Sequence, residues 1–147
     1  MCGRDVNELN DMIARTIDCS YRRAYSPRAI AFFKEYHGPG HILDDAARGY
    51  TLVAVEGGAA VGTGTLLGGE IKRVFVDPGH QGRGMGGEIM RRLIAEARAR
   101  GLRSVALHAS VVSREMYEHI GFRPVREASL DLGSGGTLDY TVMTLDL

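Results

Sequence analysis

Cysteine is scarce in this sequence, and long apolar runs are missing from it. The two cysteines, Cys2 and Cys19, have neither a disulfide framework nor the spacing of metal ligands. No apolar run approaches the roughly 20 residues that a membrane-spanning helix needs, and the N-terminal residues lack the apolar core of a signal peptide. We therefore expect free thiols, no bound metal, no membrane partner and a cytoplasmic location.

The sequence also lacks net charge, because 18 basic and 18 acidic side chains balance each other. A neutral chain is a poor generic partner for a polyanion, so we expect no nucleic-acid partner. Basic residues do cluster between Arg91 and Arg103. They fall on the polar side of a helical pattern or at its end, where cations favour the helix dipole, and we interpret them as a solvated face.

Apolar periodicity predicts one α/β domain that covers residues 1–147. The expected helices span Val6–Ile17, Pro27–Tyr36, Ile42–Arg48, Gly87–Arg100 and Ser113–Ile120. The expected strands span Tyr50–Glu56, Ala59–Leu67, Glu70–Val76, Ser104–Ala109, Arg123–Leu132 and Leu138–Leu145. The first three strands should form an antiparallel meander, and the fourth should run parallel to the third because a helix connects them. The buried side of the second helix should consist of Ile30, Phe32, Phe33 and Tyr36.

The segment from Ile71 to Gly87 combines a strand, a proline-containing turn and a glycine-rich loop that opens a helix. Unpaired N–H groups at the positive end of a helix favour a phosphorylated ligand. The segment is not a P-loop, because Met85 stands where such a loop needs lysine. It also fails the dinucleotide fingerprint, because Asp77–Gln81 separate the glycines from the strand and Ser104–Ala109 carries no carboxylate.

Residues Gln81–Gly86 read Q-G-R-G-M-G, which resembles the [Q/R]-x-x-G-x-[G/A] signature of the GCN5-related N-acetyltransferase (GNAT) superfamily. The preceding run VFVDP resembles the family's fourth strand and turn. The run from Ser113 through Tyr117 to Gly121-Phe122 resembles its second signature. The resemblance implies a mixed, mostly antiparallel central sheet of six to seven strands flanked by about four helices. The family's usual first strand is not visible in Met1–Val6, so we expect it to be very short or absent.

The resemblance implies acetyl-CoA as the cosubstrate and assigns residues to it. The pyrophosphate would bind the loop of Gln81, Gly82, Arg83, Gly84, Met85, Gly86 and Gly87, with Arg83 and the helix dipole offsetting its charge. In the family the fourth and fifth strands splay apart, which leaves backbone N–H groups at Val74, Phe75 and Val76 for the pantetheine arm and the thioester oxygen. Many members contact pantetheine through an asparagine where this sequence has Ser110, and Ser113 stands where alanine is usual.

Glu70 is one candidate for the general base. It lies 11 residues before Gln81, where histone-acetyltransferase-type members place a catalytic glutamate. Strand alternation should place its side chain on the same face as Lys72, Val74 and Val76. The alternative is a solvent-exposed carboxylate that pairs with Lys72 or Arg73.

His108 and Tyr117 complete the catalytic candidates. His108, on the neighbouring strand, is the alternative base because neutral imidazole accepts protons near pH 7; otherwise it is a histidine hydrogen-bonded in or beside the core. Tyr117 matches the family tyrosine that donates a proton to the departing thiolate. The alternative for Tyr117 is an aromatic side chain packed between helix and sheet.

Together these features imply direct transfer of the acetyl group to a primary amine on a small molecule or peptide. Two alternatives stay open: a non-catalytic acyl-CoA-binding or regulatory domain, and an acyltransferase with another acyl group or acceptor. The family selects its acceptor with segments that match Ser20–Pro27 and Gly133–Gly136. Tyr21, Arg22 and Tyr25 either contact that acceptor or serve packing. Dimers are frequent in the family, so a homodimer also stays open.

Overall fold

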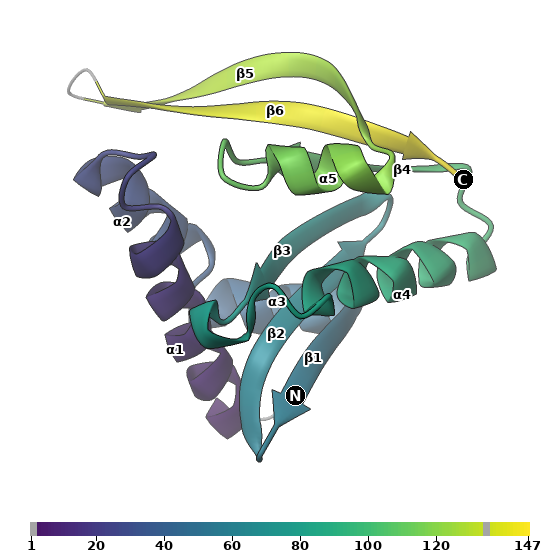
Figure 1. Ribbon diagram of the computed structural model, residues 1–147, viewed down its shortest axis with the longest axis horizontal. Helices are drawn as coiled ribbons and strands as arrows, with labels where there is room; N and C mark the ends of the chain where they lie inside the picture. The colour runs from purple at the N-terminus through teal and green to yellow at the C-terminus, as the bar shows by residue number, and fades with distance from the viewer. Residues whose placement is uncertain (1–2, 134–135) are drawn as a thin grey trace.

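The computed structural model describes residues 3–133 and 136–147, which form a twisted sheet flanked by helices (Figure 1). The helices are α1 (Gly3–Ser20), α2 (Pro27–Tyr36), α3 (Pro39–Arg48), α4 (Met85–Ala99) and α5 (Arg114–Ile120), with a short 3-10 helix η1 (Pro78–His80). The strands are β1 (Tyr50–Glu56), β2 (Ala59–Leu67), β3 (Glu70–Val76), β4 (Ser104–Ala109), β5 (Arg123–Gly133) and β6 (Gly136–Asp146). The predicted mixed sheet is confirmed with six strands, and the described chain has five α-helices rather than about four.

The strands lie in the order β1-β2-β3-β4-β6-β5. Every neighbouring pair is antiparallel except β3 and β4, which confirms the predicted parallel connection through α4. In the range where the family's first strand was expected to be very short or absent, residues 3–6 belong to α1, and Met1 and Cys2 lie outside the described residues. Residues 134–135 of the predicted loop between the last two strands also lie outside them. No helix in the described part of the chain is both long and apolar enough to cross a membrane.

Two apolar cores cover the two faces of the sheet. On one face α4 packs against β2 and β3, and Gly64 permits this contact because a Cβ there would lie 2.7 Å from Cγ2 of Ile89. In Figure 1, α4 crosses in front of β1–β3 while α3 lies behind them. On the other face α1 presents Val6, Leu9, Met12, Ile13 and Ile17, each at most 1% exposed. The two helices that apolar periodicity predicted over Val6–Ile17 and Gly87–Arg100 are confirmed as α1 and α4.

Strand β3 contains a bulge at Arg73, whose φ is 58° although it is not a glycine. The register of β3 against β2 shifts at this point. Because a bulge interrupts side-chain alternation, Lys72 and Arg73 both reach Asp45 of α3, whereas Val74 packs against the α4 core. The prediction that one face holds Glu70, Lys72, Val74 and Val76 is therefore wrong.

A buried charged cluster holds the bulge in place. Nη1 of Arg73 lies 2.9 Å from Oδ2 of Asp45, and the two side chains are only 2% and 7% exposed. Nε of Arg73 donates to Nδ1 of His37 at 3.1 Å, and Nζ of Lys72 lies 3.3 Å from Oδ2 of Asp45. Burial opposes ionisation of Asp45, but the hydrogen bond from Arg73 and the charge of Lys72 outweigh it and lower its pKa. Burial and then the charge of Arg73 lower the pKa of His37 to about 3, so its imidazole is neutral.

We expect the buried neutral His37 to make stability depend on pH. The unfolded chain takes up a proton at this residue below pH 6.5, whereas the folded chain does not until about pH 3. Stability is therefore lost as pH falls through 6.5, by about 2 kcal/mol at pH 5. His37→Asn should remove this loss while its amide oxygen still accepts from Arg73. Urea unfolding of both proteins at pH 7 and pH 5 measures the difference, and equal losses in the two would contradict the assignment.

Candidate active site

A gap between β3 and β4 organises the site. These two strands pair in register only at Glu70 and Ala106, although β3 continues to Val76. Among the described strands, the backbone of β3 from Val74 to Val76 therefore does not pair with β4, in agreement with the predicted splayed arrangement. Two pockets open from this gap, one on the side of the glycine-rich loop and one on the side of α2.

The first pocket, which we call the glycine pocket, has a volume of about 340 Å³. Gly82 and Gly84 both have a φ of 80°, which favours glycine, and open space surrounds both positions. Gly84 is the N-cap of α4. The N–H groups of the first helical turn, which have no partner within the helix, therefore lie beside this pocket. Of the predicted cofactor residues, the pocket is lined by Val74, Phe75, Val76, Gln81, Gly82, Gly84, Met85, Gly86, Gly87 and Ser113.

Two predicted cofactor residues lie elsewhere. Arg83 does not line the glycine pocket; its Nη1 lies 3.6 Å from a carboxylate oxygen of Glu56, and its side chain is 60% exposed. Ser110 is buried and lines the second pocket instead. Its hydroxyl lies 2.9 Å from the Ser113 hydroxyl and donates to the Tyr21 hydroxyl at 3.4 Å.

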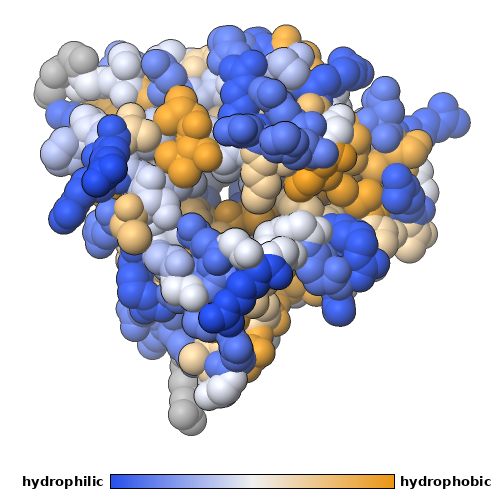
Figure 2. Space-filling model, in the orientation of Figure 1, coloured by the Kyte–Doolittle hydropathy of each residue, from blue (hydrophilic) through white to orange (hydrophobic). Residues whose placement is uncertain are grey.

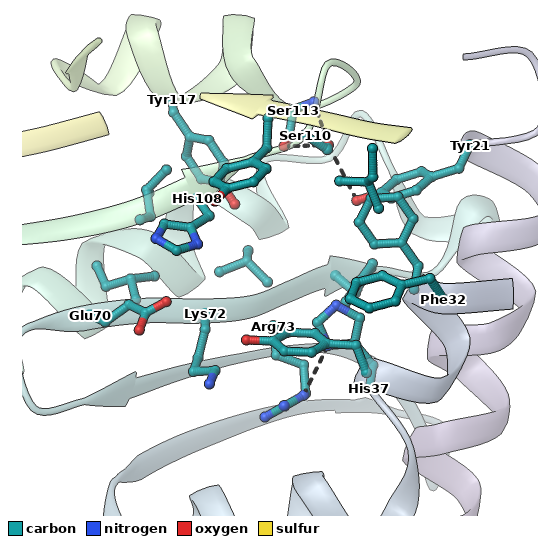
Figure 3. Close-up of a pocket in the computed structure, with 18 of the residues that line it drawn as sticks. Tyr21, Phe32, His37, Glu70, Lys72, Arg73, His108, Ser110, Ser113 and Tyr117 are labelled. Carbon is teal, nitrogen blue, oxygen red and sulfur yellow. Dashed lines mark hydrogen bonds between the residues drawn. The ribbon is translucent and has the colours of Figure 1, made fainter. Parts of the chain in front are cut away.

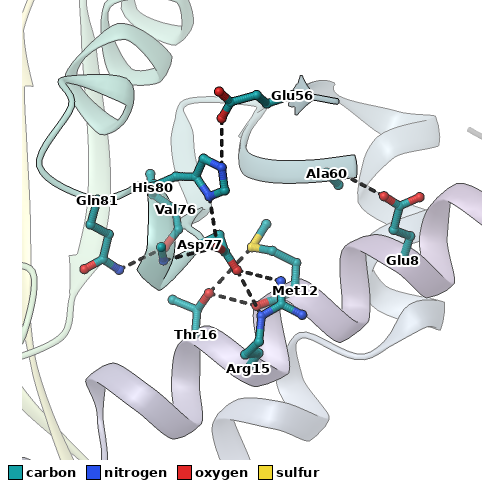
Figure 4. Close-up of polar contacts among 11 residues, drawn as sticks. Glu8, Met12, Arg15, Thr16, Glu56, Ala60, Val76, Asp77, His80 and Gln81 are labelled. Atoms are coloured by element: carbon teal, nitrogen blue, oxygen red, sulfur yellow. Dashed lines mark hydrogen bonds and ion pairs between the residues drawn. The ribbon is translucent and has the colours of Figure 1, made fainter. Parts of the chain in front are cut away.

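A polar network fixes the start of the glycine-rich loop (Figure 4). Arg15 of α1 donates to Oδ1 of Asp77 at 2.6 Å and 3.0 Å, and this bond is the main cause of the lowered pKa of Asp77. Nδ1 of His80 lies 3.0 Å from Oδ2 of Asp77, and its Nε2 lies 2.8 Å from Glu56. Gln81 donates through its amide to the Val76 carbonyl at 2.9 Å. The sequence pattern did not indicate this network, because its partners come from α1, β1 and the loop.

The second pocket, which we call the aromatic pocket, has a volume of about 320 Å³ and lies between α2, β3, β4 and β6 (Figure 3). Aromatic side chains from several elements line it, namely Tyr21, Phe32, Phe33, Tyr36, Phe75, Tyr117 and Tyr140, and His37 and His108 add two imidazoles. The space-filling view shows a hollow in the middle of the molecule with apolar side chains around it (Figure 2). The two pockets share Tyr21, Val74, Phe75 and Ser113, so they meet at the gap.

Helix α2 supplies much of this lining, which corrects the prediction of which α2 side chains are buried. The Ser26 hydroxyl caps the helix by accepting from the Ala29 N–H at 3.2 Å, as the Ser-Pro step indicated. Ala29 is the buried residue of α2, whereas Ile30, Phe32 and Phe33 are only partly buried and Tyr36 is 39% exposed. Ile30 and Phe33 pack against the core formed with α1, as predicted, whereas the prediction is wrong for Phe32 and Tyr36, which face the pocket. The sequence contained a signal of this, because the apolar stripe of Ile30, Phe32, Phe33 and Tyr36 is wider than the packing of a short helix requires.

The aromatic pocket brings the three catalytic candidates together (Figure 3). Glu70 is half-buried and has no hydrogen bond or ion pair among the described residues; its expected partners Lys72 and Arg73 bind Asp45 instead. His108 is exposed to the pocket and stacks on Tyr140, with ring centres 5.0 Å apart, so it is not a core histidine.

Tyr117 is 6% exposed and also lines this pocket. Burial raises its pKa far above the ordinary value, so the phenol stays protonated throughout the physiological pH range. Tyr21 lines both pockets. The Tyr25 hydroxyl instead accepts a hydrogen bond from the Val111 N–H at 2.8 Å and donates one to the Asp139 carbonyl at 3.2 Å. Arg22 is exposed and lines neither pocket.

Comparison with known proteins identifies the class. The model of the acetyltransferase (GNAT) domain family matches residues 21–137, which is well over half of the chain. The chain therefore belongs to the GNAT family of acyl-CoA-dependent N-acetyltransferases, for which acetyl-CoA is the cosubstrate.

Individual relatives differ in how much they share with this chain. A segment is 45% identical over 60 residues to a mycothiol acetyltransferase of Beutenbergia cavernae, covering 39% of this chain and 20% of that protein. A longer match is 30% identical over 120 residues to serotonin N-acetyltransferase 2 (chloroplastic) of Oryza sativa subsp. japonica. It covers 82% of this chain and 57% of the rice protein, so the chain spans little more than half the length of that relative.

Two solved structures have the same fold. A GCN5-related N-acetyltransferase from Rhodopseudomonas palustris matches with a TM-score of 0.90 at 22% identity, over all of this chain and 92% of the other. The PaiA N-acetyltransferase of Thermoplasma acidophilum, solved in complex with coenzyme A, matches with a TM-score of 0.78 at 16% identity. That match covers all of this chain and 96% of the other.

Proposed function

We propose that this protein transfers the acetyl group of acetyl-CoA directly to a primary amine, with residues 1–147 acting as one acetyltransferase domain. The observation that carries the proposal is the meeting of the two pockets at the β3–β4 gap. A donor in the glycine pocket and an amine in the aromatic pocket would come together beside Val74. The rice relative supports this acceptor class, because the serotonin in its name is a primary amine.

The glycine pocket supplies what a CoA pyrophosphate needs. Gly82, Gly84 and Gly86 let the backbone approach the phosphates, and the α4 N-terminus adds unpaired N–H groups and a positive dipole end. Arg83 sits at the loop surface, where it would exchange its distant contact with Glu56 for a phosphate. The β4 side of the β3 backbone at Val74–Val76, which does not pair with β4, would bind the pantetheine arm and the thioester oxygen, with Ser113 beside it.

The aromatic pocket supplies the proton transfers. An alkyl ammonium with a pKa near 10.4 is neutral in roughly one molecule in two thousand at pH 7, so a base must accept its proton. Glu70 is our assignment, because it is the one carboxylate of the described residues that lines the pocket and it has no partner. His108 lies beside it and is the alternative, directly or through water. Tyr117 would protonate the departing CoA thiolate.

Calorimetry with acetyl-CoA tests the donor site directly. We expect micromolar binding of acetyl-CoA and none of NADH. Gly86→Val should weaken acetyl-CoA binding by about tenfold or more, because the valine side chain would fill part of the pocket. A Cβ at this position would lie 3.4 Å from the sulfur of Met116. Gly40→Val is the matched control, since Gly40 is an exposed helical glycine with open space around it. Absence of acetyl-CoA binding to the unmodified protein would overturn the proposal.

Replacing Tyr117 tests the general acid. Tyr117→Phe removes the proton donor and keeps the ring, so kcat should fall by roughly a hundredfold. The affinity for acetyl-CoA should stay within about twofold, because the phenol lines the other pocket. Tyr50→Phe, at a tyrosine outside both pockets, is the control. Thiol release from CoA measures turnover, and an unchanged rate would assign Tyr117 to packing alone.

Replacing Glu70 tests the general base. Glu70→Gln should lower the transfer rate at pH 7 by about a hundredfold. The deficit should shrink at pH 9, because more of the amine is then already neutral. His108→Gln, measured in parallel, distinguishes the two candidates. A pH–rate profile for Glu70→Gln that keeps the shape of the unmodified enzyme's profile would exclude Glu70 as the base.

A further inference from the structure

Aromatic rings form two opposing walls of the aromatic pocket. On α2, Phe32 and Tyr36 stack with ring centres 6.0 Å apart and planes at 15°. Across the pocket, Tyr140 of β6 stacks on His108 of β4 at 5.0 Å and 27°. None of these four side chains is buried, and all of them line the pocket. Flat apolar surfaces that face a cavity from two sides favour a flat apolar ligand between them.

The charges of the pocket select against a second ionic group on the ligand. Lys72 and Arg73 both bind Asp45, and the Lys72 ammonium also lies 5.4 Å from the centre of the Tyr36 ring. His37 accepts a hydrogen bond from Arg73, so it provides no positive charge. Both the lysine and the arginine side chain of the described lining are therefore engaged by Asp45, and a ligand carboxylate would also face the unpaired carboxylate of Glu70.

A second ammonium on the ligand would be no better placed. Glu70 is the one acidic residue of the described lining, and the amine that reacts occupies it. A second ammonium would therefore find no free carboxylate in the described lining.

The shape of the pocket separates the two parts of such a ligand. Figure 3 shows Glu70 and His108 at one end and Phe32 and His37 at the other. The volume of about 320 Å³ is at the lower end of the range for small-molecule sites, which suits one ring system on a short chain.

We infer that the acceptor is an arylalkylamine, meaning a primary amine on a short chain that carries an aromatic ring and neither a carboxylate nor a second ammonium. Its ring lies between the α2 rings and the Tyr140–His108 pair, and its amine lies at Glu70. This inference rests on the proposed function. In the reaction, the amine nitrogen forms a bond to the acetyl carbon and the carbon–sulfur bond breaks. The amine proton leaves to the base, and the thiolate is protonated as free CoA.

A panel of matched amines tests the inference with the intact protein. Phenethylamine and tryptamine have the proposed features; phenylalanine and tryptophan add only a carboxylate to them. Butylamine keeps the amine without a ring, and spermidine adds further ammonium groups. We expect kcat/KM for phenethylamine and tryptamine to exceed the value for each of the other four by about tenfold or more.

Variants of the walls show whether the rings themselves select the acceptor. Tyr140→Leu and Phe32→Leu keep apolar volume and remove a ring, so the KM for tryptamine should rise by roughly three- to tenfold. The KM for butylamine and the affinity for acetyl-CoA should stay unchanged in both variants. Tyr140→Phe should behave like the unmodified protein. Val125→Ala, at an exposed position outside both pockets, is the control.

The outcomes separate this inference from the proposed function. If butylamine or spermidine is acetylated as well as tryptamine, the protein is an acetyltransferase but the inference is overturned. The same holds if tryptophan equals tryptamine, or if acetyl-CoA binds and no aromatic amine is acetylated. Failure of acetyl-CoA to bind overturns the proposed function and the inference with it.

Discussion

The buried ion pair between Arg73 and Asp45 is the interaction on which the site depends. A non-glycine residue with φ of 58° is strained by about 1–2 kcal/mol, and such a residue persists only where its surroundings fix it. Asp45 and His37 fix it here with hydrogen bonds to the guanidinium. The bulge that results turns Val74 toward α4 and Phe75 toward α1, so side chains on both faces of β3 border the gap.

The same ion pair affects the charge of the aromatic pocket. Because Asp45 binds both Lys72 and Arg73, the carboxylate of Glu70 is left without a partner among the described residues, in a pocket with many aromatic side chains. An unpaired carboxylate beside apolar walls is suited to accept a proton from an ammonium ion, since the ammonium is attracted to it before the transfer. The protonated Tyr117 phenol lines the same pocket, so the proposed base and the proposed acid border one cavity.

The glycine pocket is built mainly from backbone groups rather than from charged side chains. Here the backbone forms most of the pocket through the α4 N-terminus, the glycines and the stretch of β3 that does not pair with β4. Asp77 holds the start of the loop to α1 through Arg15, and this links the loop to the helix whose apolar stripe packs beneath β3. One pocket is thus built mainly from backbone and the other mainly from side chains, and side chains can change while the fold is kept.

The sequence by itself determined the local features of this protein. Strand limits at Glu56, Leu67 and Val76 were predicted correctly, because alternation and Gly-Gly turns are encoded by neighbouring residues. The glycine-rich loop at Gln81–Gly86 is likewise a local motif, since its glycines and the helix that follows them are contiguous in the chain.

Tertiary structure alone decided which charges pair and which rings face a cavity. Asp45 lies 28 residues from Arg73, and no local pattern shows that it, rather than Glu70, takes the nearby cations. Phe32 and Tyr36 of α2 were predicted to be buried, because periodicity records an apolar face without showing whether protein or ligand covers it.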